Sequence, residues 1–314
     1  MLYSILVVII GLVLLTAGAE GLVRSGSSLA LRLGVTPLVV GLTIVALGTS
    51  SPELVVSAQA AYQGSSSLAI GNIVGSNISN TALILGAAAL IYPLKAKAVV
   101  VRREMPIMIA VSGILWLMLL DGELGRLDGI FLSAGVFVYT AFVYYSARRG
   151  KQEEIEAEFE EAVDKPTKNI WIDGILLVGG VSLLVLGAKL LVDGAVEFAK
   201  LLSIPEVVIG LSVVAVGTSL PELATSTVAA FRKEPDMALG NAIGSNISNI
   251  LLVLGVTAII SPISAGEIRT VDLSMMLGVA IFLWALLGLR FVLDRLEGFI
   301  LLVVYSLYIY TLFP

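Results

Sequence analysis

Residues 41–80 read GLTIVALGTSSPELVVSAQAAYQGSSSLAIGNIVGSNISN, and residues 210–249 read GLSVVAVGTSLPELATSTVAAFRKEPDMALGNAIGSNISN. The two stretches align without a gap at a constant offset of 169 residues, and 22 of the 40 aligned positions are identical. Both copies carry GTS, PE, GN and GSNISN, so the polar positions match more closely than the apolar ones. A repeat with only a structural role would keep its apolar pattern first. This repeat therefore indicates a functional site.

The composition is that of a membrane protein. Of the 314 residues 58% are hydrophobic and 14% are charged, whereas soluble domains carry about 25% charged residues. The hydropathy of the chain, and the turn-forming residues that interrupt its apolar runs, predict an all-α integral membrane protein. Its spans of about 20 residues would cross a hydrocarbon core of about 30 Å. Ten spans are expected, at residues 3–23, 37–62, 67–92, 104–120, 125–147, 170–195, 205–231, 236–260, 271–289 and 292–312.

The ten spans divide into two halves of five. Residues 1–147 form the first half and residues 170–314 the second, and the strongly charged segment 148–169 between them reads as a cytoplasmic linker. Because five is an odd number, the two halves cross the membrane in opposite directions. Such inverted-topology repeats are the plan of secondary transporters, with the substrate site near the midplane where the repeats meet.

Lysine and arginine in the loops predict the orientation, since cytoplasmic loops carry an excess of both. With the N- and C-termini extracellular, the outer side keeps only Arg126, Lys200, Arg269 and Lys189. The cytoplasmic loops then hold Arg24, Arg32, Lys95, Lys97, Arg102, Arg103, Arg148, Arg149, Lys151, Lys165, Lys168, Arg232, Lys233, Arg290 and Arg295.

The chain contains no cysteine and no histidine. This excludes disulfides and thiol nucleophiles, and it removes the commonest general base and transition-metal ligand. Without an Asp pair in mid-span either, we expect no enzyme and no cofactor. The net charge of −5 says little about partners. The lipid bilayer is the expected surrounding, and we expect neither a nucleic-acid partner nor an obligate protein partner.

Glu53 and Glu222 occupy matched places in the middle of the second and seventh spans. A carboxylate at that depth must be paired, solvated in a cavity or bound to a cation. Lys189 is one candidate partner for an ion pair, but the residue 169 positions earlier is Glu20, so the base is not repeated. Two matched acids without matched bases favour a mobile cation over a structural ion pair.

Pro52 and Pro221 precede the two glutamates and predict a break in each helix, because proline removes one N–H and displaces the carbonyl four residues earlier. The carbonyls of residues 46–49 and 215–218 are therefore candidates for release toward a cavity or a cation. In the following spans, polar side chains at a spacing of four share one helix face, and small residues beside them permit close helix packing. The polar residues are Asn72, Ser76 and Asn80, repeated as Asn241, Ser245 and Asn249, and the small ones are Gly71, Gly75 and Ser79, repeated as Gly240, Gly244 and Ser248.

Carboxylates, hydroxyls, amide oxygens and carbonyls are the ligands of hard cations, so these groups suit calcium and sodium and do not suit zinc or copper. Two buried carboxylates carry two negative charges, which one calcium ion or two sodium ions neutralise. Competition for these charges is sufficient for ion exchange. A passive channel would need an open pore and rings of charge instead.

Paired GTSxPE and GNxxGSNIxN motifs in two inverted halves resemble the alpha repeats of prokaryotic sodium/calcium exchangers, in the calcium:cation antiporter superfamily. The resemblance covers essentially the whole chain and implies alternating access, with the first and sixth spans as the moving gate. It implies ion ligands at Glu53, Glu222, Thr49, Thr218, Ser76, Ser245 and the carbonyls of Ala46 and Ala215, supported by Ser50 and Ser219.

Two features of the third and eighth spans refine this resemblance. Several family members carry an acid at one of the positions held here by Asn80 and Asn249, so the site of this chain carries less charge. The proton-coupled branch places a Glu in the helix that contains the GN pair, and neither residues 73–80 nor 242–249 contain an acid. This favours sodium as the counter-ion and leaves proton/calcium exchange as the alternative.

Overall fold

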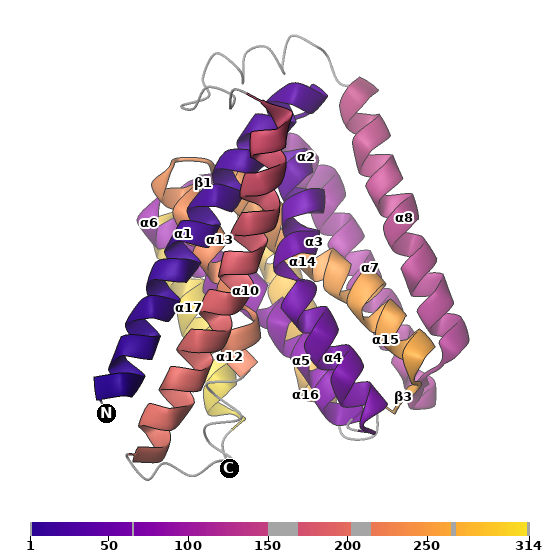
Figure 1. Ribbon diagram of the computed structural model, residues 1–314. Helices are drawn as coiled ribbons and strands as arrows, with labels where there is room; N and C mark the ends of the chain where they lie inside the picture. The colour runs from indigo at the N-terminus through magenta and orange to yellow at the C-terminus, as the bar shows by residue number, and fades with distance from the viewer. Residues whose placement is uncertain (1, 65, 150–168, 202–214, 265–267, 313–314) are drawn as a thin grey trace.

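The computed structural model describes residues 2–64, 66–149, 169–201, 215–264 and 268–312, and this part of the chain is almost entirely helical (Figure 1). Within these described ranges, seven helical stretches are long and apolar enough to cross a membrane, or eight if the bent pair over residues 37–62 counts as one span. The seven are Leu6–Leu33, Leu68–Ile91, Val100–Asp121, Arg126–Ala147, Ile170–Leu190, Pro235–Ile260 and Thr270–Arg290.

Among the described residues, both halves of the chain contain a long first helix, a helix broken at the GTS residues and two short strands. The first half contains α1 (Leu2–Leu33), α2 (Pro37–Val40), η1 (Gly41–Val45), α3 (Ala46–Thr49), α4 (Ser51–Tyr62), α5 (Ser66–Ile78), η2 (Ser79–Ile84), α6 (Leu85–Ile91), β1 (Leu94–Lys95), η3 (Val100–Glu104), α7 (Met105–Met118), η4 (Leu119–Asp121), β2 (Glu123–Leu124) and α8 (Arg126–Arg149). The second half contains α10 (Ile170–Leu201), α12 (Ala215–Thr218), α13 (Leu220–Phe231), α14 (Pro235–Ser248), η6 (Asn249–Leu254), α15 (Gly255–Ile260), β3 (Ile263–Ser264), α16 (Thr270–Arg290), β4 (Val292–Leu293) and α17 (Arg295–Tyr310).

Three of the expected spans differ from the structure. Helix α1 continues to Leu33, ten residues beyond the predicted end at residue 23, because its polar last third is packed inside the protein and Ser25 and Ala30 are fully buried. The expected span 205–231 begins outside the described residues, and from residue 215 it consists of α12 and α13. The expected span 292–312 is shortened to the 16 residues of α17, because Val292 and Leu293 form strand β4.

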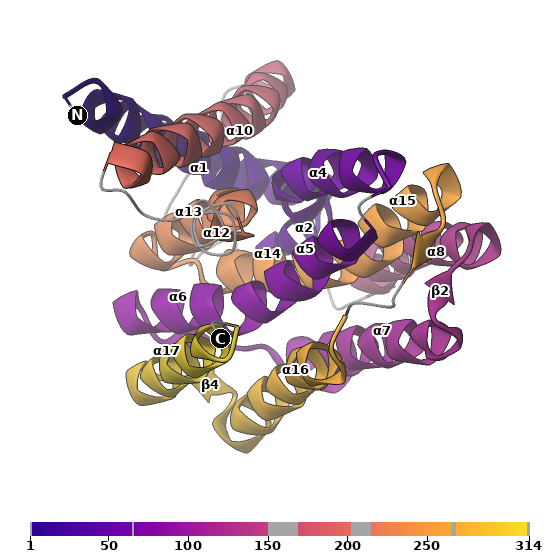
Figure 2. The same cartoon turned by 90° about the horizontal axis from the view of Figure 1, so that it is seen from below.

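Helices α1 and α10 lie side by side and run in opposite directions (Figures 1 and 2). Glycines at the crossing permit the close approach: a Cβ atom built on Gly18 would lie 2.7 Å from the carbonyl oxygen of Gly180. At one end of the pair, Arg32 Nε lies 2.6 Å from Oδ2 of the buried Asp173. The two helices therefore form one tightly coupled unit.

Two short antiparallel strand pairs join the halves. Strand β1 pairs with β4, and β2 pairs with β3. At the repeat offset of 169 residues, β1 corresponds to β3 and β2 corresponds to β4. Each pair thus contains one strand from each half of the chain.

The segments that carry the GN motifs form the core. In an apolar stretch of 18 residues within Leu68–Ile91, and in one within Pro235–Ile260, 78% of the residues are buried inside the protein, against 22–33% in the other five spans. Helix α14 lies directly on η1, since a Cβ atom on Gly244 would be 2.6 Å from the carbonyl oxygen of Leu42. The close packing predicted for the small-residue stripe is therefore confirmed at Gly240 and Gly244 in the second half. For Gly71 and Gly75 in the first half, the equivalent partner would be the segment near residue 211, which lies outside the described residues.

Candidate ion-binding site

Both helices that carry the glutamates are broken where the prolines predict. In the first motif α3 ends and α4 begins around Ser50 (φ −80°, ψ 7°), and the helix axis bends there by 43°. In the second motif Ser219 (φ −87°, ψ 6°) separates α12 from α13. Pro52 and Pro221 both stand at the start of the second helix, where the missing N–H costs no helical hydrogen bond. The GTS residues of each motif therefore lie at a helix junction.

Two of the carbonyls expected to be released are hydrogen-bonded. The carbonyl oxygen of Ala46 accepts from Ser50 N at 3.0 Å and from Thr49 Oγ1 at 3.3 Å. The carbonyl oxygen of Gly48 accepts from Ser51 Oγ at 2.7 Å. The expectation of free carbonyls is wrong for these two groups, because the backbone N–H of Ser50 still bonds to Ala46 and the hydroxyl of Ser51 bonds back to Gly48. In the second motif, the equivalent residues 215–218 form the short helix α12, and the residues before Ala215 lie outside the described part of the chain.

Glu53 and Glu222 stand in the first turns of α4 and α13, and both side chains are fully buried. Of their four carboxylate oxygens, only Oε1 of Glu222 accepts a described hydrogen bond, from Ser50 Oγ at 3.1 Å. The other three, both oxygens of Glu53 and Oε2 of Glu222, have no partner among the described residues. The two carboxylates are close enough to repel one another electrostatically. Buried anionic oxygens in this condition require a cation or a proton.

A structural ion pair does not account for these acids. Neither glutamate forms a salt bridge with a basic side chain in the described part of the chain. Lys189, the candidate partner from the sequence, is exposed on α10. Its counterpart Glu20 forms an ion pair with Arg232 instead. The bases that do pair with acids therefore lie away from the two glutamates.

Hydrogen bonds cross between the two motifs in matched pairs. Thr49 Oγ1 donates to Asn241 Oδ1 at 3.1 Å, and at the repeat offset Thr218 Oγ1 donates to Asn72 Oδ1, also at 3.1 Å. Each asparagine then donates from Nδ2 to a serine of the neighbouring helix at 3.0 Å, Ser226 for Asn241 and Ser57 for Asn72. The GTS turn of one half thus rests against the GN helix of the other half.

The predicted serines take part in the same arrangement. Ser219 Oγ donates to Ser76 Oγ at 3.2 Å, and Thr49 Oγ1 lies 3.4 Å from Ser245 Oγ. All four of these residues, like Ser50, belong to the predicted set. The structure therefore brings hydroxyls from both motifs together around the two glutamates.

Asn80 and Asn249 stand at the start of the wide helical turns η2 and η6, and both are fully buried. Within the part of the chain that the structure describes, neither polar side-chain atom of Asn80 has a hydrogen-bond partner, and Asn249 Oδ1 also lacks one. Among the described residues neither asparagine hydrogen-bonds to a glutamate. Wide turns of this kind occur frequently at functional sites.

A second polar cluster beside these turns was missed by the sequence reasoning. Asn77 Nδ2 donates to the carbonyl oxygen of Asn246 at 3.1 Å, Asn246 Nδ2 donates to Thr81 Oγ1 at 2.8 Å, and Asn249 Nδ2 donates to Asn77 Oδ1 at 3.0 Å. Asn77 and Asn246 are identical positions of the repeat and belong to GSNISN. That identity was the available signal, but the spacing of four selected the neighbouring helix face.

Comparisons with known proteins agree with this geometry. The family described as sodium/calcium exchanger protein matches residues 3–146 and 173–313. The chain is 41% identical over 319 residues to the putative antiporter CaxA of Alkalimonas amylolytica, with 100% of this chain and 99% of CaxA covered. It is 34% identical over 355 residues to the sodium/calcium exchanger MaX1 of Methanosarcina acetivorans, with 99% and 98% covered. A structure of the sodium-calcium exchanger NCX_Mj superimposes with a TM-score of 0.85 at 30% identity, with 98% of both chains covered.

The chain therefore belongs to the sodium/calcium exchanger family. It is a multi-pass membrane protein whose chemistry is cation antiport without a cofactor, and it is not an enzyme. This confirms the family expected from the paired motifs.

Proposed function

We propose that this protein exchanges sodium for calcium by alternating access, with the ions bound near the membrane midplane between two inverted repeats of five spans. The observation that carries the proposal is the pair of fully buried carboxylates of Glu53 and Glu222, three of whose four oxygens have no partner among the described residues. One calcium ion or two sodium ions would neutralise both charges. The family membership and the likeness to NCX_Mj support the same ions.

The proposed ligands come from both motifs and offer only oxygen atoms, which suits calcium and sodium. The carboxylates hold the ions, and hydroxyls, amides and a backbone carbonyl complete the coordination. The proposed set is Glu53, Glu222, Thr49, Thr218, Ser76, Ser245, Asn80, Asn249 and the carbonyl of Ala215, with Ser50 and Ser219 in support, and the hydrogen-bonded carbonyl of Ala46 is left out.

The proposed moving gate is the pair α1 and α10, which packs against the site from outside. A Cβ atom on Gly48 would lie 2.9 Å from Cγ2 of Val181, so α10 contacts the GTS turn itself. In the proposed arrangement residues 1–147 and 170–314 form the two repeats. A movement of α1 and α10 would then open the site to one side of the membrane at a time.

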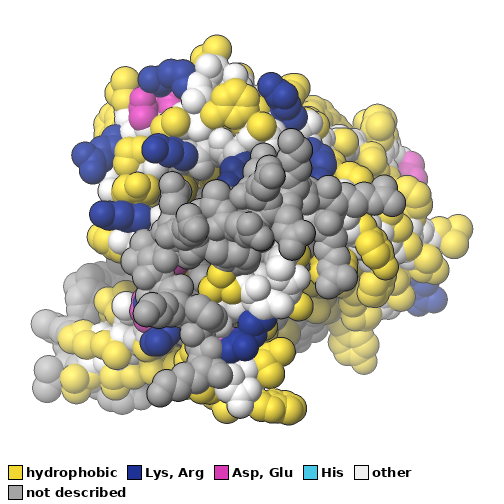
Figure 3. Space-filling view, turned by 90° about the horizontal axis from the view of Figure 1, so that it is seen from above, with side chains coloured by type: hydrophobic (Ala, Val, Ile, Leu, Met, Phe, Trp, Pro, Cys, Tyr) yellow, Lys and Arg dark blue, Asp and Glu magenta, His cyan; other side chains and the backbone are white. Residues whose placement is uncertain are grey.

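The proposed orientation places both termini outside and segment 148–169 in the cytoplasm. Helix α8 ends and α10 begins at the upper end of Figure 1, and α1 begins at the lower end. Lysine and arginine side chains are spread over the upper face, with few acidic side chains among the described residues (Figure 3). An excess of positive charge on the cytoplasmic side supports this orientation.

Proton/calcium exchange is the alternative, because two buried carboxylates can also carry protons. The absence of a third acid from residues 73–80 and 242–249 favours sodium. The name of CaxA states only that it is a putative antiporter, so that relative does not distinguish the two.

The test is uptake of radiolabelled calcium into proteoliposomes preloaded with sodium, beside liposomes that hold potassium or a pH gradient. We expect uptake that requires internal sodium and that Glu53→Gln abolishes. Uptake driven by the pH gradient alone would establish the proton alternative. No gradient-dependent uptake under any condition would contradict both.

A further inference from the structure

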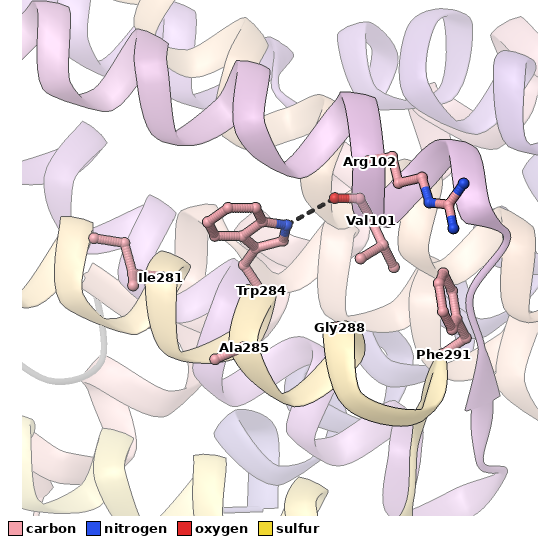
Figure 4. A pocket seen from close by; sticks show the side chains of 7 residues that line it. All are labelled: Val101, Arg102, Ile281, Trp284, Ala285, Gly288 and Phe291. Atoms are coloured by element: carbon pink, nitrogen blue, oxygen red, sulfur yellow. Dashed lines mark hydrogen bonds between the residues drawn. The ribbon is translucent and has the colours of Figure 1, made fainter.

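A groove of about 710 Å³ lies on the surface between η3 and α16, and neither of the two glutamates lines it (Figure 4). Its α16 wall consists of Ile281, Trp284, Ala285 and Gly288, spaced so that all four share one helix face. Because Ala285 and Gly288 are small, space remains between the two walls, and a Cβ atom built on Gly288 would meet no described atom within 4 Å. The groove is therefore mostly apolar and open.

The opposite wall of the groove, formed by η3, is joined to α16 by a hydrogen bond. Trp284 Nε1 donates to the carbonyl oxygen of Val101 at 2.7 Å, across the groove (Figure 4). Val101 lies in the wide turn η3, which departs from regular α-helical geometry. The indole ring therefore ties the two walls together and leaves its apolar surface beside the hollow.

Both walls belong to helices that are long and apolar enough to cross a membrane, Val100–Asp121 and Thr270–Arg290. On the α16 wall, Ile281 is 44% exposed and Trp284 is 40% exposed, whereas Val101 on the opposite wall is buried. In a multi-pass membrane protein, an exposed apolar groove between two spans faces the acyl chains of lipids. Its occupant must therefore present a hydrocarbon chain.

One end of the groove carries a positive charge that no described acid neutralises. Arg102 and Phe291 lie together at that end (Figure 4). Arg102 is exposed and forms no salt bridge or hydrogen bond with the described residues, unlike its neighbour Arg103, which pairs with Glu104 at 2.6 Å. Arg290 nearby is also paired, with Asp294 and Glu297, each at 2.9 Å. A guanidinium with five donors matches a phosphate group, and basic pockets between membrane helices bind anionic lipid headgroups.

We propose that this groove binds a phospholipid with an anionic headgroup, with one acyl chain along Trp284 and Gly288 and the phosphate group on Arg102. The apolar length, the membrane-facing position and the uncompensated arginine each select the same kind of ligand. A soluble phosphate would use the charge and leave the apolar length empty, and a neutral lipid would use the apolar length and leave the charge unmatched.

The test uses Trp284 as the probe. The chain has three tryptophans, so W116F/W171F leaves only the indole in the groove. This protein is reconstituted in phosphatidylcholine vesicles that contain brominated phosphatidylglycerol or brominated phosphatidylcholine, and quenching of the fluorescence reports which lipid occupies the groove. We expect a preference of about fivefold for phosphatidylglycerol, the contribution of one arginine near an anionic surface.

The variants separate the two parts of the proposal. Arg102→Gln should abolish the preference and Arg102→Lys should retain most of it, whereas Arg126→Gln, which removes an exposed arginine elsewhere, should leave it unchanged. Gly288→Leu should reduce quenching by both lipids. Gly113→Leu is the matched control, since a Cβ atom there also meets nothing within 4 Å and Gly113 does not line the groove.

Equal quenching by the two lipids before any groove mutation, or a preference that survives Arg102→Gln, would overturn the proposal. Displacement of the brominated lipid by millimolar glycerol phosphate would also overturn it, because the ligand would then be a free phosphate. If Gly288→Leu fails to fold, the Arg102 series decides the question alone.

Discussion

Ser50 donates a hydrogen bond from Oγ to Oε1 of Glu222 at 3.1 Å, across 172 residues of sequence. Ser50 belongs to the first copy of the repeated motif and Glu222 to the second. The two copies are therefore in direct contact through a buried hydrogen bond. If the proposed ion site lies between them, a change in either copy should affect the same ions.

Glu222→Gln should abolish sodium-dependent calcium uptake. The substitution keeps the shape of the side chain but removes one of the two negative charges proposed to hold the calcium ion, and removing one partner of a buried pair of opposite charges costs about 3–5 kcal/mol. We expect the calcium concentration for half-maximal uptake to rise by at least about 100-fold. Glu123→Gln is the control, because Glu123 is exposed on β2. Normal uptake by Glu222→Gln would contradict the assignment of this side chain as a ligand.

Thr49→Ala should weaken calcium binding while Thr49→Ser should retain it. The Thr49 hydroxyl bonds to Asn241 at 3.1 Å and is a proposed ligand. Removing the hydroxyl leaves the buried Asn241 Oδ1 without this partner, which costs about 1–3 kcal/mol, so the alanine variant should bind calcium at least about 5-fold more weakly. Calcium titration of the purified protein by calorimetry measures this. If serine is as damaging as alanine, the methyl group and its packing matter instead of the hydroxyl.

Gly244→Ala should destabilise the protein. The added Cβ atom would lie 2.6 Å from the carbonyl oxygen and 2.7 Å from the Cα atom of Leu42, and neither backbone atom can move alone. Overpacking of this kind costs about 1–3 kcal/mol. Thermal unfolding in detergent should show a lower midpoint than for wild type. Gly278→Ala is the control in another helix, because a Cβ atom there meets nothing within 4 Å, and an unchanged midpoint for Gly244→Ala would refute the close packing of α14 on η1.

The Arg32–Asp173 pair should couple α1 to α10. Its N–O distance is 2.6 Å, and Asp173 is fully buried whereas the Arg32 side chain is 28% exposed. We expect Asp173→Asn and Arg32→Gln each to lower the unfolding midpoint, with the double variant less destabilised than the sum. The coupling in a double-mutant cycle should be about 1 kcal/mol, since partial exposure of Arg32 weakens the pair. Strict additivity would show that the two side chains do not interact.

Local rules predicted the helix junctions and the two buried acids well. Pro52 and Pro221 determine where each helix breaks, because a proline ring cannot continue the backbone hydrogen bonds. The same reasoning was wrong about the carbonyls of Ala46 and Gly48. Whether such a carbonyl becomes free depends on which backbone N–H groups and which hydroxyl rotamers still reach it, and a helix-breaking rule carries no information on either.

Contacts between the halves were beyond local rules. The pairing of β1 with β4, the extension of α1 to Leu33 and the Asn77–Asn246 contact all join residues more than 100 positions apart or depend on burial against distant helices. Hydropathy identifies which residues leave water and does not identify what they meet.

The sequence by itself determined the membrane class, the repeat, the family and the acids, because composition, periodicity and a 169-residue offset are properties of the chain alone. Only the tertiary structure decided that Thr49 meets Asn241 and Thr218 meets Asn72, so that each motif completes the other. It also decided that Arg102 ends an apolar groove. The physical reason is that a site is a set of distances in space, and those distances arise only when the packing of α14 on η1 brings the two halves into contact.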